Sequence, residues 1–486
     1  MKTYLEIFKE LNSVPRPSHH EELVADYLCR FASERGLDHS RDANNCVVIR
    51  KPASPGCECA DTVVILNHMD MVCVAKESYL RDGRRFDPLK DGIRAYVETD
   101  EAGERWMKAE GTSLGADNGM GLSMALAILD DDSLIHPALE VLTTTNEEDG
   151  MSGAEGLSTS FITGRKVINL DSEAYDEITV GAAGACLPVG SWSLIHDTVP
   201  EGFAFFKIVI DGGLGGHSGV DINKGRCNCN KELASALCRL SEQIPGLRVC
   251  SIDGGTANAS IASCAEAVIA VPQDCSSAVQ TFVSTLKDEL SSRFADTDHG
   301  ISARVCPWRP QSCFISNASD IIRTIASLPF GVLEMRSDMP GTVMTSNNIG
   351  IVKTDGEVLT VSCHTRSFSN EEQDRLSASI RNQMTEGGAS GVEMLMNTGS
   401  WVERADSPLL DLTCRTFMDV LGFEPRKVAM HFVLEAAYYV EKYPGVEIAS
   451  IGPRIIEPHS TSERVSLDTA EGIWKVTVEL LRRLAR

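Results

Sequence analysis

The stretch that decides the fold is DTVVILNHMDMVC, residues 61–73. Its run of β-branched and aliphatic residues at 62–66 is typical of a strand that is buried on both faces, as in a parallel sheet. The run ends on His68 and Asp70, two ionisable side chains separated by one residue. Ligands of open α/β sheets bind at the carboxyl ends of strands. The stretch therefore predicts an interior strand that ends at a functional site.

Similar apolar runs alternate with helical patterns before and after this stretch. The expected strands are 45–51, 62–68, 138–148, 165–173 and 446–455, and the expected helices include 118–133 and 466–486. This alternation predicts an α/β domain with a mixed, largely parallel sheet. A further helix is expected to start at Ser18, because Glu21 lies three residues later and completes a capping box.

The middle of the chain has a different pattern, with shorter and more alternating strands around two expected helices. The strands include 204–213, 263–271 and 357–368, and the helices lie near 228–243 and 276–294. A chain of 486 residues is also too long for one ordinary core. We therefore expect an inserted α+β lid domain at 187–399, with a catalytic domain formed by 1–186 and 400–486.

The composition argues against several classes of function. The 45 Lys and Arg residues against 69 Asp and Glu residues give a net charge of −24, which repels nucleic acids and anionic membranes. No stretch approaches the roughly 18 apolar residues of a membrane span. The N-terminus has no signal-peptide core, so a cytoplasmic location is expected. The 16 cysteines are scattered without a C-x-x-C pair, unlike those of a disulfide scaffold.

Other acidic and histidine residues follow apolar strands or precede a helix, as His68 does at 61–73. These further candidate ligands are Asp117, Glu147, Glu148, Asp171 and His459. Two histidines and several carboxylates without a thiolate signature suit Zn²⁺ or a similar divalent ion. The set is too large for one catalytic zinc with an open position, and it suits two ions that share a carboxylate. We predict two divalent ions, Zn²⁺ foremost, with Mn²⁺ or Co²⁺ as alternatives.

Two acidic groups have expected roles beside these ligands. Asp70 can hold the second imidazole nitrogen of His68 and so fix its tautomer. In the pair Glu147-Glu148, one carboxylate would bind metal while the other acts as general base for water. Each residue also has an ordinary explanation, such as an N-cap for Asp117 or a solvated loop for the glutamate pair. The metal hypothesis depends on their joint occurrence at strand ends.

Six motifs give the chain a recognisable resemblance: HMDMV, GTSLGADNGMG, NEEDGMSGA, INLDSE, GGHSGVDI and EPHSTSERV. In this order they resemble the co-catalytic zinc peptidases of the aminoacylase and glutamate carboxypeptidase superfamily. Within that group the chain is most similar to the aminoacyl-histidine (Xaa-His) dipeptidases, also called peptidase D. The resemblance extends over nearly the whole chain. It implies metal-dependent hydrolysis of dipeptides, either Xaa-His or a broader set.

The resemblance implies a role for each matching residue of the catalytic domain. One ion would be bound by His68 and Asp171 and the other by Glu148 and His459, with Asp117 bridging. Asp70 would orient His68. Glu147 would be the general base.

The resemblance also implies that the inserted domain is a lid for substrate binding and for a homodimer. His217, in GGHSG, matches the histidine that polarises the scissile carbonyl. Taken alone, the same motif would be a glycine turn that exposes a surface histidine. Arg366 would pair with a substrate carboxylate, and Asn258 and Asn348 would make further substrate contacts.

One stretch departs from the family pattern. The family usually reads HAGLECG where this chain has HFVLEAA, residues 431–437. His431 and Glu435 are retained as expected substrate-binding residues, but Phe432 and Val433 replace two small residues. Since the metal ligands are unaffected, the reaction class is expected to hold while the preference for substrate side chains changes.

Two alternatives to a dipeptidase follow from the same residues. A deacylase of N-acyl amino acids would need the same metal site without recognition of a free amino group. A metal-containing protein that only binds peptides would need no base, so Glu147 argues against it. Glu173 and Asp149, near the expected metals, would attract an ammonium group and favour dipeptides.

Overall fold

The computed structural model describes residues 2–402, 404 and 406–486, and the chain divides into two compact units. Unit 1 consists of Met1–Gly181, Val402–Ala429 and Glu435–Arg486, and unit 2 consists of Ala182–Trp401 and Met430–Leu434. The expected domain boundaries lie at 186 and 399.

The segment Met430–Leu434 belongs to unit 2, although it lies within the expected 400–486 part of the catalytic domain. In the structure the carbonyl of Met430 accepts the N–H of Ala183, and His431 Nε2 lies 2.7 Å from Ser346 Oγ. These contacts attach the pentapeptide to unit 2. Its neighbour Glu435 lies in unit 1.

Unit 1 is built on a mixed sheet with the strand order β1-β2-β8-β3-β9-β24-β10-β22, and β23 pairs with β10. The strands are β1 Asp38–Arg41, β2 Val47–Lys51, β3 Val63–His68, β8 Leu139–Thr144, β9 Lys166–Asn169, β10 Glu177–Ala182, β22 Trp401–Val402, β23 Arg426–Met430 and β24 Glu447–Ser450. The four central strands β8, β3, β9 and β24 run parallel, whereas β1, β2 and β10 pair antiparallel. The predicted α/β fold class is confirmed.

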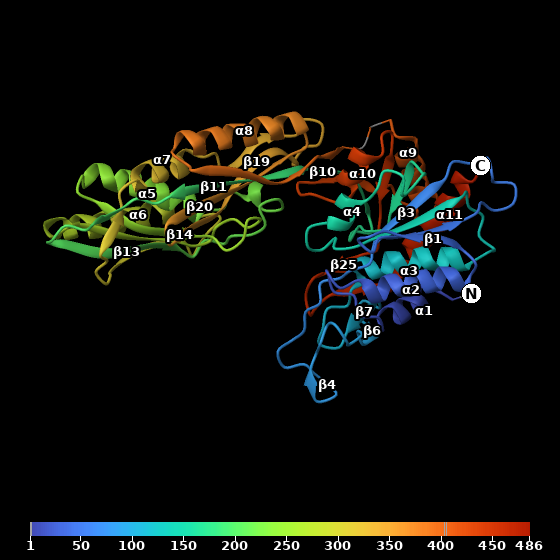
Figure 1. The fold of residues 1–486 in the computed structure, drawn as a ribbon. Helices are drawn as coiled ribbons and strands as arrows, with labels where there is room; N and C mark the ends of the chain where they lie inside the picture. The colour runs from blue at the N-terminus through green and yellow to red at the C-terminus, as the bar shows by residue number, and fades with distance from the viewer. Residues whose placement is uncertain (1, 403, 405) are drawn as a thin grey trace. The chain divides into compact units, whose positions relative to one another are not determined.

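Seven helices accompany this sheet among the described residues of unit 1. They are α1 Tyr4–Leu11, α2 Glu22–Glu34, α3 Ala116–Asp130, α4 Ser152–Gly156, α9 Pro408–Leu421, α10 Ala436–Lys442 and α11 Leu467–Leu484. Helix α3 packs on β3 and β8, and α1 lies beside it (Figure 1). Every residue of β3 and β8 is buried, which explains the apolar run 63–66 of β3. No helix of the described residues has the length and apolar character needed to span a bilayer.

The capping box expected at Ser18 is absent. Helix α2 begins at Glu22, and no side chain caps its first turn. The Ser18 hydroxyl instead donates to Asp70 Oδ2 at 2.8 Å, and Glu21 Oε1 accepts the N–H of Asn146 at 3.0 Å. The prediction was wrong because both side chains bind distant parts of the chain.

A smaller sheet of unit 1 holds the loop that carries His459. It has the order β25-β26-β7-β6, with β25 Ile455–Ile456, β26 Arg464–Ser466, β7 Arg105–Ala109 and β6 Ala95–Thr99. The loop 457–463 is therefore fixed at both ends by strand pairing. A short hairpin, β4 Leu80–Arg81 with β5 Arg84–Arg85, lies in the segment before β6.

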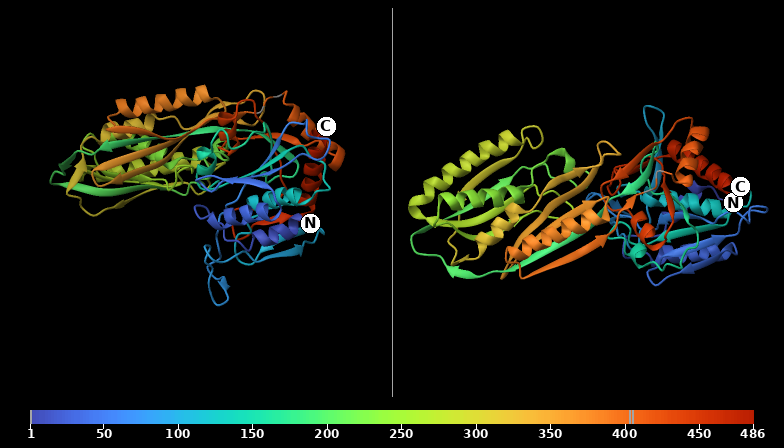
Figure 2. Two further views of the ribbon diagram at one scale, coloured as in Figure 1. Left: turned by 45° about the vertical axis from the view of Figure 1, so that its right-hand side comes forward. Right: turned by 90° about the horizontal axis from the view of Figure 1, so that it is seen from above.

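Unit 2 has an antiparallel sheet with the order β16-β13-β15-β14-β19-β20-β11-β21, and β18 pairs with β19. Its strands are β11 Gly184–Ser193, β13 Phe203–Asp211, β14 Arg248–Gly254, β15 Ala265–Pro272, β16 Ser302–Pro307, β18 Gly331–Met335, β19 Val343–Asp355, β20 Val358–Ser367 and β21 Gly391–Thr398. The helices α5 Cys229–Gln243, α6 Ser276–Arg293, α7 Ala318–Ser327 and α8 Asn370–Glu386 lie on one face of this sheet (Figures 1 and 2). One buried core joins all four helices to the strands. The expected α+β character of the insertion is confirmed.

Candidate active site

Three adjacent parallel strands of unit 1 end at the same edge of the sheet. Strand β3 ends at His68, which pairs with Thr144 at the end of β8. Glu147 and Glu148 follow β8, and Asp171 follows β9. Because parallel strands all point the same way, the residues that follow them meet at one edge.

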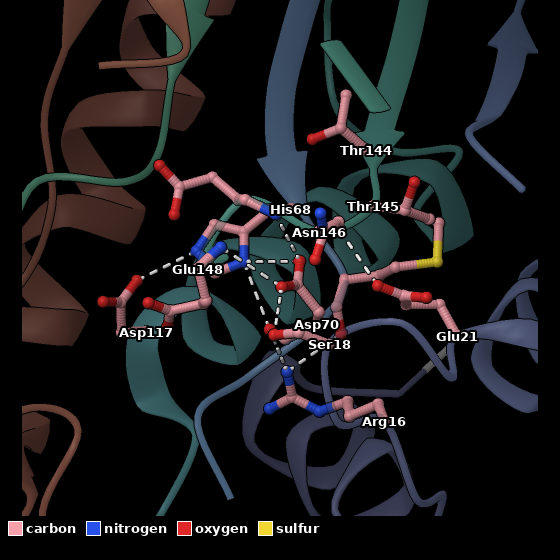
Figure 3. Close-up of polar contacts among 12 residues, drawn as sticks. Arg16, Ser18, Glu21, His68, Asp70, Asp117, Thr144, Thr145, Asn146 and Glu148 are labelled. Carbon is pink, nitrogen blue, oxygen red and sulfur yellow. Dashed lines mark hydrogen bonds and ion pairs between the residues drawn. The ribbon is translucent and has the colours of Figure 1, made fainter. Parts of the chain in front are cut away.

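The structure brings the five predicted metal ligands together. His68 Nε2 lies 3.0 Å from Asp117 Oδ1 and 3.3 Å from Asp171 Oδ1. His459 Nε2 lies 2.7 Å from Glu148 Oε2 and 3.3 Å from Asp117 Oδ2. The Asp117 carboxylate thus lies between the two imidazoles, with one oxygen facing each. Figure 3 shows Asp117 and Glu148 beside His68.

The residues present fit divalent metal ions. Ligand atoms of His68, Asp117 and Glu148 lie within 4.8 Å of one another, a separation suited to a shared cation. Glu148 Oε1 is buried and has no hydrogen-bond partner among the described residues, so its lone pairs are available. Burial, together with the neighbouring carboxylates, raises the pKa of Asp171 to about 6. A bound cation would relieve this repulsion between carboxylates.

Asp70 ties the end of β3 to the turn that carries the glutamate pair. Its buried side chain accepts the N–H of Glu147 on Oδ1 at 3.1 Å and that of Glu148 on Oδ2 at 3.2 Å. His68 Nδ1 lies 3.5 Å from Asp70 Oδ1 and 3.1 Å from its carbonyl oxygen. This arrangement leaves His68 Nε2 facing the cluster. Asp70 therefore positions both the imidazole and the backbone of the two glutamates.

We expect Asp70→Asn to weaken metal binding by about 10–100-fold, the usual effect of losing a group that orients metal ligands. Asparagine has one acceptor oxygen in place of two, so one of the two N–H groups of Glu147 and Glu148 loses its partner. Competition with a chromophoric chelator measures the affinity. Asp149→Asn is the matched control, since Asp149 follows the same pair but its side chain is 75% exposed. Equal affinities of Asp70→Asn and the wild type would contradict the positioning role.

The two side chains of the glutamate pair have different surroundings in the structure. Glu148 contacts His459, whereas Glu147 forms none of the cluster's ion pairs among the described residues. Burial raises the pKa of Glu147 well above its ordinary value, and the charges of Asp171 and Glu148 act in the same direction. A carboxylate with a raised pKa is a stronger base, as general-base catalysis requires.

Sequence reasoning missed two charged residues that contact the loops of this site, Arg16 and Glu463. Both side chains are buried, at 1% and 3% exposed. Glu463 lies inside the quoted motif EPHSTSERV, four residues after His459, and that proximity was the available signal. Arg16 stands between two prolines in a segment that carried no metal-ligand pattern.

The predicted substrate-binding residues of the insertion lie in unit 2, together with His431. Arg366 is buried and donates to Ser218 Oγ at 3.3 Å. Asn348 donates to the carbonyls of Asn258 and Ser260 at 3.3 and 2.8 Å, so it holds the 258–260 turn. Their role toward a substrate stays a prediction.

Two histidines of unit 2, His217 and His431, are neutral near pH 7. Burial lowers the pKa of His217 to about 4, and Arg366 contributes to this shift. Burial and Arg366 likewise lower the pKa of His431 to about 3. Each ring therefore acts as a neutral hydrogen-bonding group.

The chain is 34% identical over 481 residues to the cytosol non-specific dipeptidase of Escherichia coli (strain K12), covering 99% of this chain and 97% of that one. The chain belongs to the peptidase D-like dipeptidase family. The predicted resemblance is thereby confirmed, and the protein is a metal-dependent hydrolase. A second member, the aminoacylhistidine dipeptidase of Vibrio alginolyticus, has a crystal structure that matches with a TM-score of 0.87 and 31% identity, over 99% of this chain and 96% of that one.

Two further comparisons are more limited: one matches only a segment of this peptidase D-like chain, and the other shows only a shared fold. Residues 204–298 match the family model of a peptidase dimerisation domain. A tripeptidase from Staphylococcus aureus subsp. aureus mu50 has the same fold, with a TM-score of 0.56 at 13% identity, over 99% of this chain and 98% of that one.

The departure of this peptidase D-like chain from HAGLECG has a structural consequence in unit 2. The Phe432 ring packs edge-on against the His217 ring, with centroids 5.8 Å apart. A Cβ atom at Gly219 would lie 2.4 Å from the His431 carbonyl oxygen, so the GGHSG loop needs glycine there. The GGHSG motif is therefore packed against the altered stretch, and Phe432 restricts the space beside His217.

Proposed function

We propose that this protein hydrolyses the peptide bond of dipeptides with two divalent metal ions bound in unit 1. The observation that carries the proposal is the Asp117 carboxylate, which lies between two imidazoles with one oxygen toward each. The relatives from Escherichia coli and Vibrio alginolyticus, named as a non-specific and an aminoacylhistidine dipeptidase, support the substrate class. The substrates would be Xaa-His dipeptides or a broader set.

Each ion would have its own ligands and share one. His68 and Asp171 would hold the first ion, Glu148 and His459 the second, and Asp117 would bridge them. Mixed nitrogen and oxygen ligands suit Zn²⁺ best, with Mn²⁺ or Co²⁺ as alternatives. The ions would supply Lewis-acid activation of water and of the scissile carbonyl.

Glu147 would move the proton. It would accept a proton from the attacking water and then deliver that proton to the leaving amine. Its raised pKa supports this role, because the group must hold the proton between the two steps. Asp70 would keep Glu147 in place through the backbone N–H bond at 3.1 Å.

Unit 2 would supply groups that recognise the substrate. Neutral His217 would donate a hydrogen bond to the oxyanion, and Arg366 would pair with the substrate carboxylate. His431, Asn258 and Asn348 would contribute further contacts, as would Glu435 of unit 1. Burial raises the pKa of Glu435 to about 8.

A paired substrate panel tests the proposed function. We expect the metal-loaded protein to hydrolyse free dipeptides, Xaa-His members included, and to leave their N-acetylated forms and N-acyl amino acids uncleaved. Glu173 supports recognition of a free amino group, since burial and the charges of Asp117 and Asp171 raise its pKa to about 8 and an ammonium would offset those charges. Product amino acids are measured by chromatography. Preferential cleavage of N-acyl amino acids would identify a deacylase, and binding without cleavage would identify a peptide-binding protein.

We also propose a homodimer formed through unit 2, which the match of residues 204–298 to a peptidase dimerisation domain supports. A cytoplasmic location is proposed because the Escherichia coli relative is named a cytosol enzyme.

A further inference from the structure

A single buried guanidinium joins two loops of the metal site. Arg16, in the segment between α1 and α2, donates from Nη1 to the carbonyls of Met69 and Asp70, each at 3.1 Å. Its Nη2 donates to the carbonyl of Gly115 at 2.6 Å. Figure 3 shows Arg16 beside Asp70 and Ser18. Arg16 thus connects the loop after His68 with the loop that leads to Asp117.

A buried carboxylate holds the second of these loops from another direction. Glu463 Oε2 accepts the N–H groups of Leu114 and Gly115 at 2.6 and 2.9 Å. Its Oε1 accepts the N–H of Ala116 at 2.7 Å, with that of Asp117 at 3.5 Å. Glu463 therefore binds the N-terminal backbone of α3 and lies in the same loop as His459. A carboxylate at this end of a helix is also favoured by the helix dipole.

The two charges act on opposite ends of one residue, Gly115. Its N–H donates to Glu463 and its carbonyl accepts from Arg16. A Cβ atom at Gly115, which has φ 69°, would lie 2.5 Å from Arg16 Nη2, and one at Gly119 would lie equally close. The backbone of GTSLGADNG approaches the guanidinium so closely that only glycine fits. The guanidinium is held through Nη1 and Nη2, whereas its buried Nε has no hydrogen-bond partner among the described residues. A buried charge is tolerated when hydrogen bonds of this kind compensate for its desolvation.

We propose that Arg16 and Glu463 are positioning residues that fix three loops, 68–70, 114–117 and 457–463, and so set the separation of the metal ligands. His68, Asp117 and His459 each belong to one of these loops. None of the described contacts of either side chain reaches a predicted ligand atom, so both would act through the backbone. The inference rests on the proposed metal site and adds to it the residues that determine its geometry.

The test compares metal binding with folding in the full-length protein. Arg16→Lys keeps a positive charge but cannot span both loops, and Glu463→Gln keeps the size but replaces one acceptor oxygen by a donor. Zn²⁺ affinity is measured by chelator competition, and the visible spectrum is recorded with Co²⁺. We expect affinity to fall about 10–100-fold in each variant, with an altered Co²⁺ spectrum. We also expect kcat to fall while KM changes little.

Arg35→Met is the matched control. Arg35 Nε donates to Asp130 Oδ1 at 2.6 Å, at the opposite end of the same helix α3. Its loss is expected to lower the melting temperature without changing Zn²⁺ affinity or the Co²⁺ spectrum. If Arg16→Lys does not fold, the metal affinity and Co²⁺ spectrum of Glu463→Gln test the positioning role. Glu463→Asp is a further variant, because its shorter side chain cannot reach all the N–H groups that Glu463 binds.

Two outcomes separate this inference from the proposed function. Wild-type affinity and spectrum in Arg16→Lys and Glu463→Gln, even with lowered stability, would overturn the positioning role. A wild-type protein that binds two metal equivalents but cleaves no dipeptide would refute the proposed function, while the positioning role would still be decided by the variants. A wild-type protein that binds no metal would refute both.

Discussion

Glu147→Gln is expected to lower kcat by about 10²–10⁴-fold, the usual contribution of a general base, while the protein keeps both metal equivalents. Glutamine has the same shape but cannot accept the proton of the attacking water. Metal retention is expected because Glu148, not Glu147, is the member of the pair that contacts His459. Single-substrate kinetics and elemental analysis of the same sample measure the two quantities.

The stability of the metal-free Glu147→Gln variant gives an independent check. Folding raises the pKa of Glu147, so in the wild type the stability that depends on this group is present at low pH and is lost as the pH rises through the raised pKa. The Glu147→Gln variant has no ionisable group at this position and therefore does not lose this stability as the pH rises. Its metal-free melting temperature at neutral pH should equal or exceed that of the wild type.

Glu148→Gln is the matched comparison for the base assignment. It changes the adjacent residue in the same chemical way, but it should weaken metal binding as well as turnover, since Glu148 Oε2 lies 2.7 Å from His459. A Glu147→Gln protein with near wild-type kcat would show that another group takes the proton.

Asp117→Asn is expected to have the second large effect, the loss of both ions. Asparagine keeps one oxygen, so it cannot face both imidazoles with a carboxylate oxygen as Asp117 does. We expect metal affinity to fall by more than the 10–100-fold typical of groups that only orient ligands. Activity should fall at least ~10³-fold, since metal activation contributes several kcal/mol. Elemental analysis after dialysis and assays with added Zn²⁺ or Mn²⁺ measure both effects.

Chelation distinguishes this explanation from simple damage to the fold. Ions that bind only the folded state stabilise it, so a chelator should lower the melting temperature of the wild type. The Asp117→Asn protein should melt at the same temperature with and without chelator. Asp130→Asn, at the other end of α3, should respond to chelator as the wild type does. Two tightly bound ions in Asp117→Asn would show that Asp117 does not bridge them.

The predicted strands and the positions of the predicted metal ligands followed from local patterns. The apolar run before His68 forms β3 and is buried throughout. The runs before Glu147 and Asp171 form β8 and β9, and these neighbour β3 in the sheet. Such strands can be recognised in a sequence because each buried position of a strand favours an apolar residue. The order of the motifs then pointed to the family that the full-length relative shows.

Other features were decided only by the tertiary structure. Ser18 and Glu21 have the spacing of a capping box, yet they bind Asp70 and Asn146. Arg16 and Glu463 both bind Gly115, from 99 and 348 residues away in the chain.

The sequence by itself determined where the strands lie and which side chains stand at their ends, because hydrophobic periodicity acts between near neighbours. Only the tertiary structure decided which buried charges support those ends. A hydrogen bond between distant segments produces no periodic pattern in the sequence. Its partners can be identified only from the tertiary structure, in which packing brings the two segments together.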